Sequence, residues 1–278
     1  MWLRCADRVL DLRFPRVMGV LNVTPDSFSD GGRFVDVAAA MSAAERMRAA
    51  GADIIDVGGE STRPGAAAVS ADEEWRRVEP ILCALLERGA CVSLDSSKPE
   101  VIRAGLALGV HLINDVYALR QPGALEAVAS SSAAVCLMHM QGEPRTMQRA
   151  PHYVDVVAEV GDFLAERLRA ARAAGISEDR LVIDPGFGFG KSLPHNLALL
   201  RRLGELQSLA VPILAGLSRK SMLAQLTGRP VEARLAGSLA LALAACEGGA
   251  RIIRVHDVAE TVDALKVWRA WRHETTLD

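Results

Sequence analysis

The sequence lacks several features that define other classes of protein. Aromatic residues make up only 4% of its 278 residues, so a core drawn from the 50% of hydrophobic residues must consist mainly of Ala, Leu, Val and Ile. The net charge of −2 at pH 7 provides no positive excess, which argues against nucleic acid as a partner. An anionic ligand would therefore have to meet a local cluster of cations.

Further absences concern compartment and metal. The five cysteines form no C-x-x-C pair, so we expect buried, reduced thiols in a cytoplasmic protein. The start, MWLRCADRVLDLRFPRV, carries charges throughout and lacks the apolar centre of a signal peptide. The apolar stretch SLALALAAC at 238–246 is too short to span a bilayer, so no membrane is expected as a partner. The histidines show no zinc-binding spacing.

What is present is a regular alternation of short apolar runs and helical stretches. The runs are spaced by roughly the thirty residues of a strand–helix–strand unit. Most are continuously apolar, which is typical of parallel strands covered on both faces. We therefore expect an α/β protein whose residues 1–278 form a single (β/α)8 TIM barrel domain, with an open doubly wound sheet as the alternative. The expected strands are 16–21, 53–58, 91–95, 111–115, 134–139, 181–184, 212–218 and 251–256.

Two helices can be delimited closely. Residues 37–51 have apolar positions at helical spacing and end at a glycine. The stretch 70–89 begins with Ser70 followed by acids, which suits the positive end of a helix. Pro80 lies inside this stretch and is expected to kink or divide the helix.

Polar side chains end nearly every expected strand. Asp and Asn often cap turns, so Asp56 or His139 alone has about even odds of being structural. A set that converges on one end of a barrel is better explained by an active site, which in such barrels lies at the C-terminal ends of the strands. The set comprises Asn22, Asp56, Asp95, Asn114, Met138, His139, Asp184, Ser218, Arg219, Lys220, Arg254 and His256.

The stretch DPGFGFGKS at 184–192 resembles two nucleotide-binding loops without matching either. A phosphate-binding loop would need glycine where Pro185 stands, and the dinucleotide fingerprint needs a different glycine spacing. We interpret the stretch mainly as a glycine-permitted turn after a strand. Phe187 and Phe189, on a mobile loop, could form a wall against a flat ligand.

The strand-end residues indicate a particular ligand. Asp95, Asn114 and Asp184 offer acceptors and an amide to a flat heterocycle rich in N–H groups. The cationic set of Arg63, Lys220, Arg254 and His256 suits phosphate oxygens. Asn22 adds an oxygen ligand for Mg²⁺, which usually binds a few protein oxygens plus substrate phosphates. A bicyclic heterocycle that carries a pyrophosphate fits this composite.

At this point the sequence resembles the dihydropteroate synthase family of pterin-binding barrels. The similarity extends from Met18 to Asp257, with the motifs in the family's order and spacing. The motifs are MGVLNVTPDSFSDGG, GADIIDVGGESTRPGA, SLDSSKPEVI, INDV, LMHMQGEPRTMQ, DPGFGFGKS, LSRKSML and RIIRVHDV.

The resemblance implies an enzyme of folate biosynthesis. Such an enzyme condenses 4-aminobenzoate with 6-hydroxymethyl-7,8-dihydropterin pyrophosphate to give 7,8-dihydropteroate and pyrophosphate, uses Mg²⁺, is a sulfonamide target and forms a homodimer through its late helices. The alternatives are a pterin-binding paralogue without synthase activity and a methyltetrahydrofolate-binding methyltransferase.

The resemblance also implies residue roles. The catalytic set would be Asp95, Asp184, Lys220, Arg254 and His256. The pterin would be bound by Asp95, Asn114, Met138, Asp184, Lys220 and Arg254. The pyrophosphate would be bound by Asn22 through the metal, and by Thr62, Arg63, Arg254 and His256. The aminobenzoate would be bound by Phe28, Thr62, Pro64, Phe189, Lys220 and Ser221.

Overall fold

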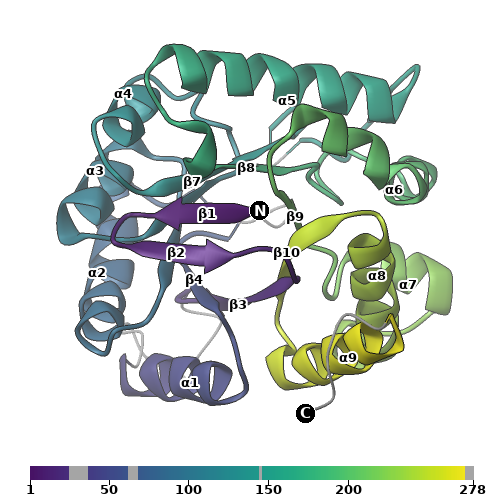
Figure 1. Cartoon of the computed structure of the whole chain (residues 1–278), viewed down its shortest axis with the longest axis horizontal. Coiled ribbons are helices and arrows are strands. Elements are labelled where there is room, and N and C mark those ends of the chain that lie inside the picture. Colours follow the sequence, from purple (N-terminus) through teal and green to yellow (C-terminus); the bar gives the residue numbers. More distant parts are fainter. Residues whose placement is uncertain (25–36, 62–67, 144–145, 273–278) are drawn as a thin grey trace.

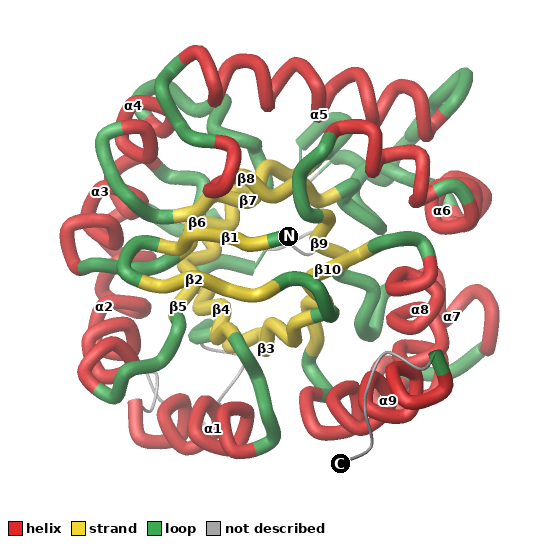
Figure 2. The backbone as a smooth tube through the Cα atoms, in the orientation of Figure 1, coloured by secondary structure: helices red, strands yellow, loops and turns green. Residues whose placement is uncertain are grey.

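The structure is a computed structural model that describes residues 1–24, 37–61, 68–143 and 146–272. In this part of the chain, eight parallel strands close into a barrel in the order β10-β3-β4-β5-β6-β7-β8-β9, and helices surround it (Figures 1 and 2). The first and last barrel strands pair with each other, which confirms the barrel and excludes the open sheet. The strands are β3 (Arg16–Asn22), β4 (Ile54–Gly58), β5 (Val92–Asp95), β6 (Leu112–Asp115), β7 (Ala134–Met138), β8 (Leu181–Asp184), β9 (Ile213–Ala215) and β10 (Ala250–Val255).

Helices follow the strands as the alternating pattern predicts. They are α1 (Val37–Ala49), α2 (Ala71–Glu87), α3 (Pro99–Leu108), α4 (Ala124–Ala129), α5 (Val156–Ala173), α6 (Leu193–Arg201), α7 (Ser221–Thr227), α8 (Leu235–Glu247) and α9 (Val258–Trp271).

Helix α2 begins as predicted but passes its proline without a break. The Ser70 hydroxyl accepts the Glu73 N–H at 3.2 Å, which caps the helix. The prediction that Pro80 divides the helix is wrong, because α2 is continuous from Ala71 to Glu87. Pro80 has no N–H group to donate to the carbonyl of Arg76, four residues earlier. Both residues are exposed, so water can hydrate that carbonyl instead.

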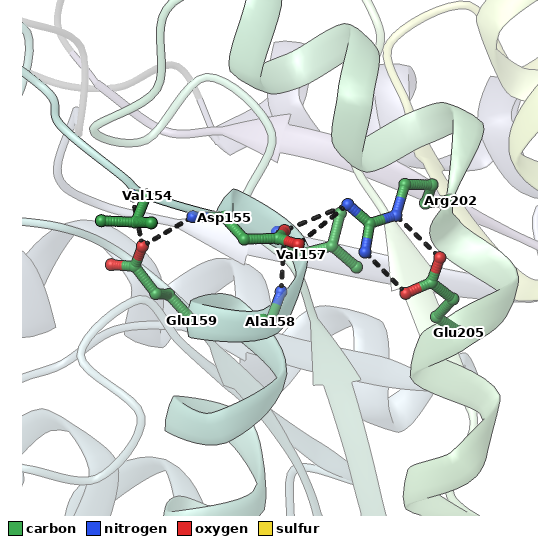
Figure 3. Close-up of polar contacts among 7 residues, drawn as sticks. All are labelled: Val154, Asp155, Val157, Ala158, Glu159, Arg202 and Glu205. Carbon is green, nitrogen blue, oxygen red and sulfur yellow. Dashed lines mark hydrogen bonds and ion pairs between the residues drawn. The ribbon is translucent and has the colours of Figure 1, made fainter.

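Polar contacts fix the start of α5 against the segment after α6 (Figure 3). The Asp155 carboxylate accepts the N–H groups of Val157 and Ala158 at 2.9 and 3.2 Å, as a helix cap does. Arg202 then donates to Asp155 at 3.1 Å and to Glu205 at 2.7 Å. These bonds connect two neighbouring outer helices on the surface.

The alternation of side chains along the strands produces two apolar cores. Outward-facing residues such as Val17, Ile55 and Leu94 pack against the helices. Inward-facing residues such as Met18 and Ile54 fill one end of the barrel. The polar ends of the strands therefore lie above a closed, apolar base.

A two-stranded hairpin closes that base. Strands β1 (Trp2–Cys5) and β2 (Arg8–Asp11) pair antiparallel and lie across the ring of strands in Figure 1. Leu3 and Leu12 are fully buried in the same cluster as the inward-facing strand residues. The sequence pattern does not predict this hairpin, because its strands are short and interrupted by charge.

The cysteines form no disulfide bond in the structure. All five are free, and all except the half-buried Cys83 are buried. Burial raises the pKa of Cys91 to about 12, so this thiol is unreactive. Among the described residues no helix is both long enough and apolar enough to cross a membrane.

Candidate active site

A polar layer replaces the apolar interior one step nearer the C-terminal ends of the strands. Each of its residues follows an inward-facing apolar residue by two positions, as in Ile54 and Asp56 of β4. Side chains two apart on a strand face the same way, so the whole layer points into the barrel. Its polar residues are Asp56, Ser93, Asn114, Asp184 and Arg254, and at the same level Cys136 of β7 belongs to the apolar cluster.

Arg254 joins two carboxylates across the mouth of the barrel. Its Nε donates to Asp56 Oδ2 at 2.6 Å, and its second terminal nitrogen donates to Asp95 Oδ2 at 2.6 Å. Asp56 Oδ2 also accepts the Asn114 side-chain amide at 3.1 Å. Charged hydrogen bonds of this length fix both partners in one geometry.

Burial makes the two predicted pterin-binding acids difficult to ionise. Burial raises the pKa of Asp95 to about 7; Arg254 opposes the rise, whereas the nearby charge of Asp56 adds to it. The pKa of Asp184 is also raised by burial, against the effects of the Gly186 N–H and Lys220. A ligand that donates N–H groups to these carboxylates would favour their charged forms.

Lys220 lies at the edge of the same mouth, just before α7. Its ammonium lies over the Phe189 ring, 4.3 Å from the centroid. Burial lowers the pKa of Lys220 to about 8, and Asp184 partly opposes this effect. Phe189 also packs against an apolar cluster that includes Met138, which is buried at the end of β7. A cation, an aromatic ring and a thioether thus border the polar layer.

The glycine turn after β8 is extensively hydrogen-bonded. Gly186, Gly188 and Gly190 have φ of +68°, +80° and +60°, values that glycine adopts without strain. The Lys191 ammonium donates to the carbonyls of Gly186 and Phe189 at 3.0 and 3.1 Å. These bonds favour one conformation of the turn, which the sequence predicts to be mobile. Further bonds come from Tyr153 to Gly190, Gln148 to Gly188, and Gly188 to Asn196.

Two residues near this turn are structural. Phe187 is 1% exposed and packs in the core between barrel and helices, so the expectation that it faces a ligand is wrong. His139 is also buried, with Nδ1 2.9 Å from the Lys191 ammonium. Burial lowers the pKa of His139 to about 2, so its ring is neutral. For His139 the structural interpretation holds.

His256 follows β10 and has an imidazole whose surroundings favour the neutral form. Burial lowers its pKa to about 4, and the Arg254 charge adds to the effect. This lowered pKa argues against the cationic His256 that the sequence predicts. Ser218 Oγ accepts the His256 backbone N–H at 3.2 Å and lies 3.1 Å from Nδ1. When the ring proton is on Nε2, Nδ1 can accept from this hydroxyl, and the Nε2–H group is free to donate.

Arg219 is one of the predicted polar strand-end residues, but its contacts stabilise the local backbone. Its guanidinium forms a two-pronged ion pair with Asp257. Its backbone N–H donates to Ser238 Oγ at 3.0 Å, and its φ is +58°. These contacts fix the turn that presents the neighbouring Lys220.

Asn22 is the residue predicted to bind a metal. It ends β3 and is half-buried. Among the described residues no group of three His, Cys, Asp or Glu could hold a metal ion. A single amide oxygen fits Mg²⁺ only where substrate oxygens and water supply the other ligands.

Four of the predicted site residues lie outside the described residues: Phe28, Thr62, Arg63 and Pro64. Ser221 is described and is the exposed first residue of α7. The structure brings together the predicted pterin residues Asp95, Asn114, Met138, Asp184, Lys220 and Arg254 at one end of the barrel.

Two buried residues have no role in the predicted catalytic and binding sets, although Asp56 is one of the predicted polar strand ends. Asp56 is fully buried and contacts both Arg254 and Asn114. Its position at the end of an expected strand is the sequence feature that points to a role in the site. Lys191 is 3% exposed and braces the glycine turn. Its sequence context, a glycine-rich turn, gives no sign of that role.

Comparisons with known proteins agree with this geometry. A family model described as pterin binding enzyme matches residues 18–256. Dihydropteroate synthase of Escherichia coli (strain K12) is 55% identical over 262 residues, which cover 94% of this chain and 93% of that protein.

Solved structures show the same likeness. A Yersinia pestis dihydropteroate synthase in complex with a sulfonamide drug has a TM-score of 0.93 and 50% identity, covering 98% of this chain and 100% of that one. A Xanthomonas albilineans dihydropteroate synthase with 4-aminobenzoic acid has a TM-score of 0.92 and 56% identity, covering 98% of each chain.

The closed barrel, its polar mouth and the family match define a pterin-binding barrel enzyme. Within that class the chain belongs to the dihydropteroate synthase family.

Proposed function

We propose that the chain condenses 4-aminobenzoate with 6-hydroxymethyl-7,8-dihydropterin pyrophosphate, giving 7,8-dihydropteroate and pyrophosphate. The observation that carries this proposal is the polar mouth of the barrel, where buried Asn114 and Asp184 and half-buried Asp95 lie at the strand ends beside Lys220 and Arg254. Buried groups of this kind need a ligand that supplies complementary donors.

The pterin ring would lie on this layer. Its N–H groups would donate to Asp95 and Asp184, and its carbonyl would accept from Lys220. Asn114 would present its amide oxygen, because its NH₂ group already donates to Asp56. Met138 and Arg254 would border the ring, with Met138 supplying apolar contact.

The pyrophosphate would lie toward Arg254 and His256. The Nε2–H of a neutral His256 can donate to a phosphate oxygen, and the approach of that anion would raise the pKa of the ring. Thr62 and Arg63 are proposed partners from the segment outside the described residues. Asn22 would hold Mg²⁺ together with substrate oxygens; when bound, the ion neutralises charge on the leaving group.

The aminobenzoate would lie at the outer edge of the mouth. Phe189 and Lys220 are stacked there and offer a flat apolar face beside a cation. Ser221 begins α7 next to Lys220 and adds a hydroxyl. Phe28, Thr62 and Pro64 are proposed to complete this pocket, where sulfonamides that resemble 4-aminobenzoate would also bind.

The reaction follows from these positions. The bond between the pterin methylene and the pyrophosphate oxygen breaks, and pyrophosphate leaves with the electron pair. Asp95 and Asp184 stabilise the positive charge that spreads through the pterin ring, while Arg254 and His256 stabilise the departing anion. The arylamine nitrogen then bonds to the methylene and loses a proton. No covalent enzyme intermediate is needed, since both substrates are held in line.

Activity distinguishes this proposal from the two alternatives. A pterin-binding paralogue would bind the pterin without releasing pyrophosphate, and a methyltetrahydrofolate-binding methyltransferase would not use a pyrophosphate ester. With the pterin pyrophosphate and 4-aminobenzoate, the purified protein should form 7,8-dihydropteroate, identified by mass spectrometry, and release pyrophosphate. Tight pterin binding without dihydropteroate would contradict the proposal and support the paralogue.

We also propose a homodimer built through the late helices. Val267 and Trp271 lie one helical turn apart on α9 and are each 70% exposed. Their burial against a second copy would remove an apolar surface from water. Light scattering coupled to size-exclusion chromatography should give about twice the 29.7 kDa of one chain, and Trp271→Glu should shift the species toward the monomer.

The cysteines support a cytoplasmic setting as part of the proposal, because all five are free. Residues 1–278 are proposed to act as one pterin-binding barrel domain.

A further inference from the structure

We infer that Asp56 is a positioning residue of the synthase reaction: its carboxylate fixes the Asn114 amide and the Arg254 guanidinium in the orientation that receives the pterin. This inference rests on the proposed function. Asp56 itself would not touch the substrate, because its side chain is completely buried and its Oδ2 atom accepts hydrogen bonds from those two residues.

The first step concerns Asn114. An amide side chain can present either its oxygen or its NH₂ group to a ligand. Here the NH₂ group donates to Asp56 Oδ2 at 3.1 Å, over 58 residues of sequence. A carboxylate only accepts hydrogen bonds when ionised, so the reversed amide would place oxygen against oxygen. Asp56 therefore leaves the Asn114 oxygen as the atom available to ring N–H groups.

The second step concerns Arg254. The same Oδ2 atom accepts the Arg254 Nε at 2.6 Å, while Asp95 accepts from a terminal nitrogen at 2.6 Å. The guanidinium is planar, so two contacts along different edges fix its plane as well as its position. Without Asp56 only the terminal contact would remain, and the guanidinium could rotate about it.

The third step excludes a purely stabilising role. Among the described residues, Asp56 Oδ1 is buried without a hydrogen-bond partner, and so is Oγ of Ser93, its register partner on β5. An ionised carboxylate with one oxygen unpaired is costly in a barrel interior. An apolar residue would stabilise the interior better, so orientation of the neighbours explains Asp56 better than stability does.

Asp56 also affects the charge of Asp95. Its charge raises the pKa of Asp95, and it competes with Asp95 for the single Arg254 guanidinium. Other groups that act on Asp95 are Glu74 of α2 and Asp115 of β6, which raise its pKa, and Lys220, whose charge is favoured by the Asp95 carboxylate. Removing the Asp56 charge should therefore make Asp95 ionise at lower pH.

The test compares Asp56→Asn with wild type and with Asp53→Asn. Asp53 precedes the same strand but pairs with Arg16 at 3.0 Å, away from Arg254 and Asn114. In Asp56→Asn we expect the KM for the pterin pyrophosphate to rise about tenfold or more, with the KM for 4-aminobenzoate changed less than about twofold. The acid limb of kcat/KM should move down by about one pH unit.

The control should behave differently. Asp53→Asn should lower the melting temperature without moving the acid limb. An Asp56→Asn enzyme that loses activity equally at every pH, or that keeps the wild-type KM, overturns the inference. If Asp56→Asn does not fold by circular dichroism, Asp56→Ser keeps an acceptor for Asn114, removes the charge, and is expected to show the same shift of the acid limb.

Failure of the proposed function is separable from failure of this inference. An inactive wild-type protein would contradict the synthase proposal alone. Calorimetric titration with 6-hydroxymethylpterin would then replace kinetics: the wild-type affinity should show the acid limb and Asp56→Asn should shift it. Equal pH dependence of pterin affinity in both proteins would overturn the positioning role.

Discussion

At the residue scale, Lys220 shows how a side chain that looks dispensable in sequence acquires a role. A lysine just after a strand is ordinarily solvated, but this ammonium lies over Phe189 beside Asp184, which favours its charged form. We predict that Lys220→Ala lowers kcat/KM by about 100-fold or more, because it removes a charged donor from the site.

A matched control is Lys266→Ala, since Lys266 is 70% exposed and pairs only with Asp263 of its own helix in the described structure. That variant should keep wild-type kinetics. Near-wild-type rates for Lys220→Ala would show that this ammonium does not act on substrate.

The protonation of Lys220 should make kcat/KM depend on pH. Burial lowers the pKa of Lys220 to about 8, so its ammonium is present below that pH and is lost above it. In the free enzyme, kcat/KM should therefore decline as pH rises through about 8. Lys220→Arg, which stays charged, should lose this alkaline limb even if its rate is lower. An unchanged limb in Lys220→Arg would assign it to another group.

His256 should take up a proton when pyrophosphate binds. Its pKa of about 4 makes it neutral in the ligand-free protein, and an adjacent anion would favour the imidazolium. Calorimetry of pyrophosphate binding near pH 6, in buffers of different ionisation enthalpy, should report proton uptake. The uptake should disappear in His256→Gln; the same uptake in that variant would contradict the assignment.

At the scale of elements, the strands were predictable and the contacts between their ends were not. Continuous apolar runs located all eight barrel strands, because covered parallel strands have that pattern. The bond from Arg254 to Asp56 spans 198 residues, and no local spacing predicts it. The sequence does not reveal that α2 continues through Pro80, because a helix tolerates a proline on its exposed side and packing decides which side is exposed. The N-terminal hairpin was missed because short, charged strands carry a weak signal.

The glycine turn after β8 is the element that most depends on exact backbone shape. A Cβ on Gly186 would overlap the carbonyl oxygen of His139, in addition to being strained at φ +68°. Gly175 has a similar φ of +93°, but a Cβ added there would meet no atom within 4 Å. Gly175→Ala should therefore cost only about 1–2 kcal/mol of unfolding free energy.

Gly186→Ala should cost clearly more and should weaken pterin binding, because the turn carries Asp184 at its start and Phe189 near its tip. Denaturant unfolding of both variants checks this comparison. Equal losses of stability would mean that the turn can move away from His139.

At the scale of the whole molecule, stability and activity lie at opposite ends of the barrel. Leu3 of the hairpin is fully buried in the apolar base, which lies beneath the polar layer. Leu3→Ala should lower the unfolding free energy by about 2–5 kcal/mol through the cavity it leaves. At a temperature where the variant is folded, both KM values should be unchanged. A changed pterin KM would show that the two ends are coupled.

The central claim is that the polar layer in the barrel mouth binds the pterin, and Asp184 tests it most directly. Asp184→Asn keeps the shape of the side chain but presents a donor where the ligand also donates. The control is Asp115→Asn, another buried acid at a strand end, whose carboxylate bonds to Tyr117 and Leu119 of the following turn.

The measurement is calorimetric titration of wild type and both variants with 6-hydroxymethylpterin, each with a normal circular dichroism spectrum. The account predicts that Asp184→Asn weakens binding by about 1–3 kcal/mol or more, while Asp115→Asn binds as wild type does. Wild-type affinity in a folded Asp184→Asn protein would contradict the account.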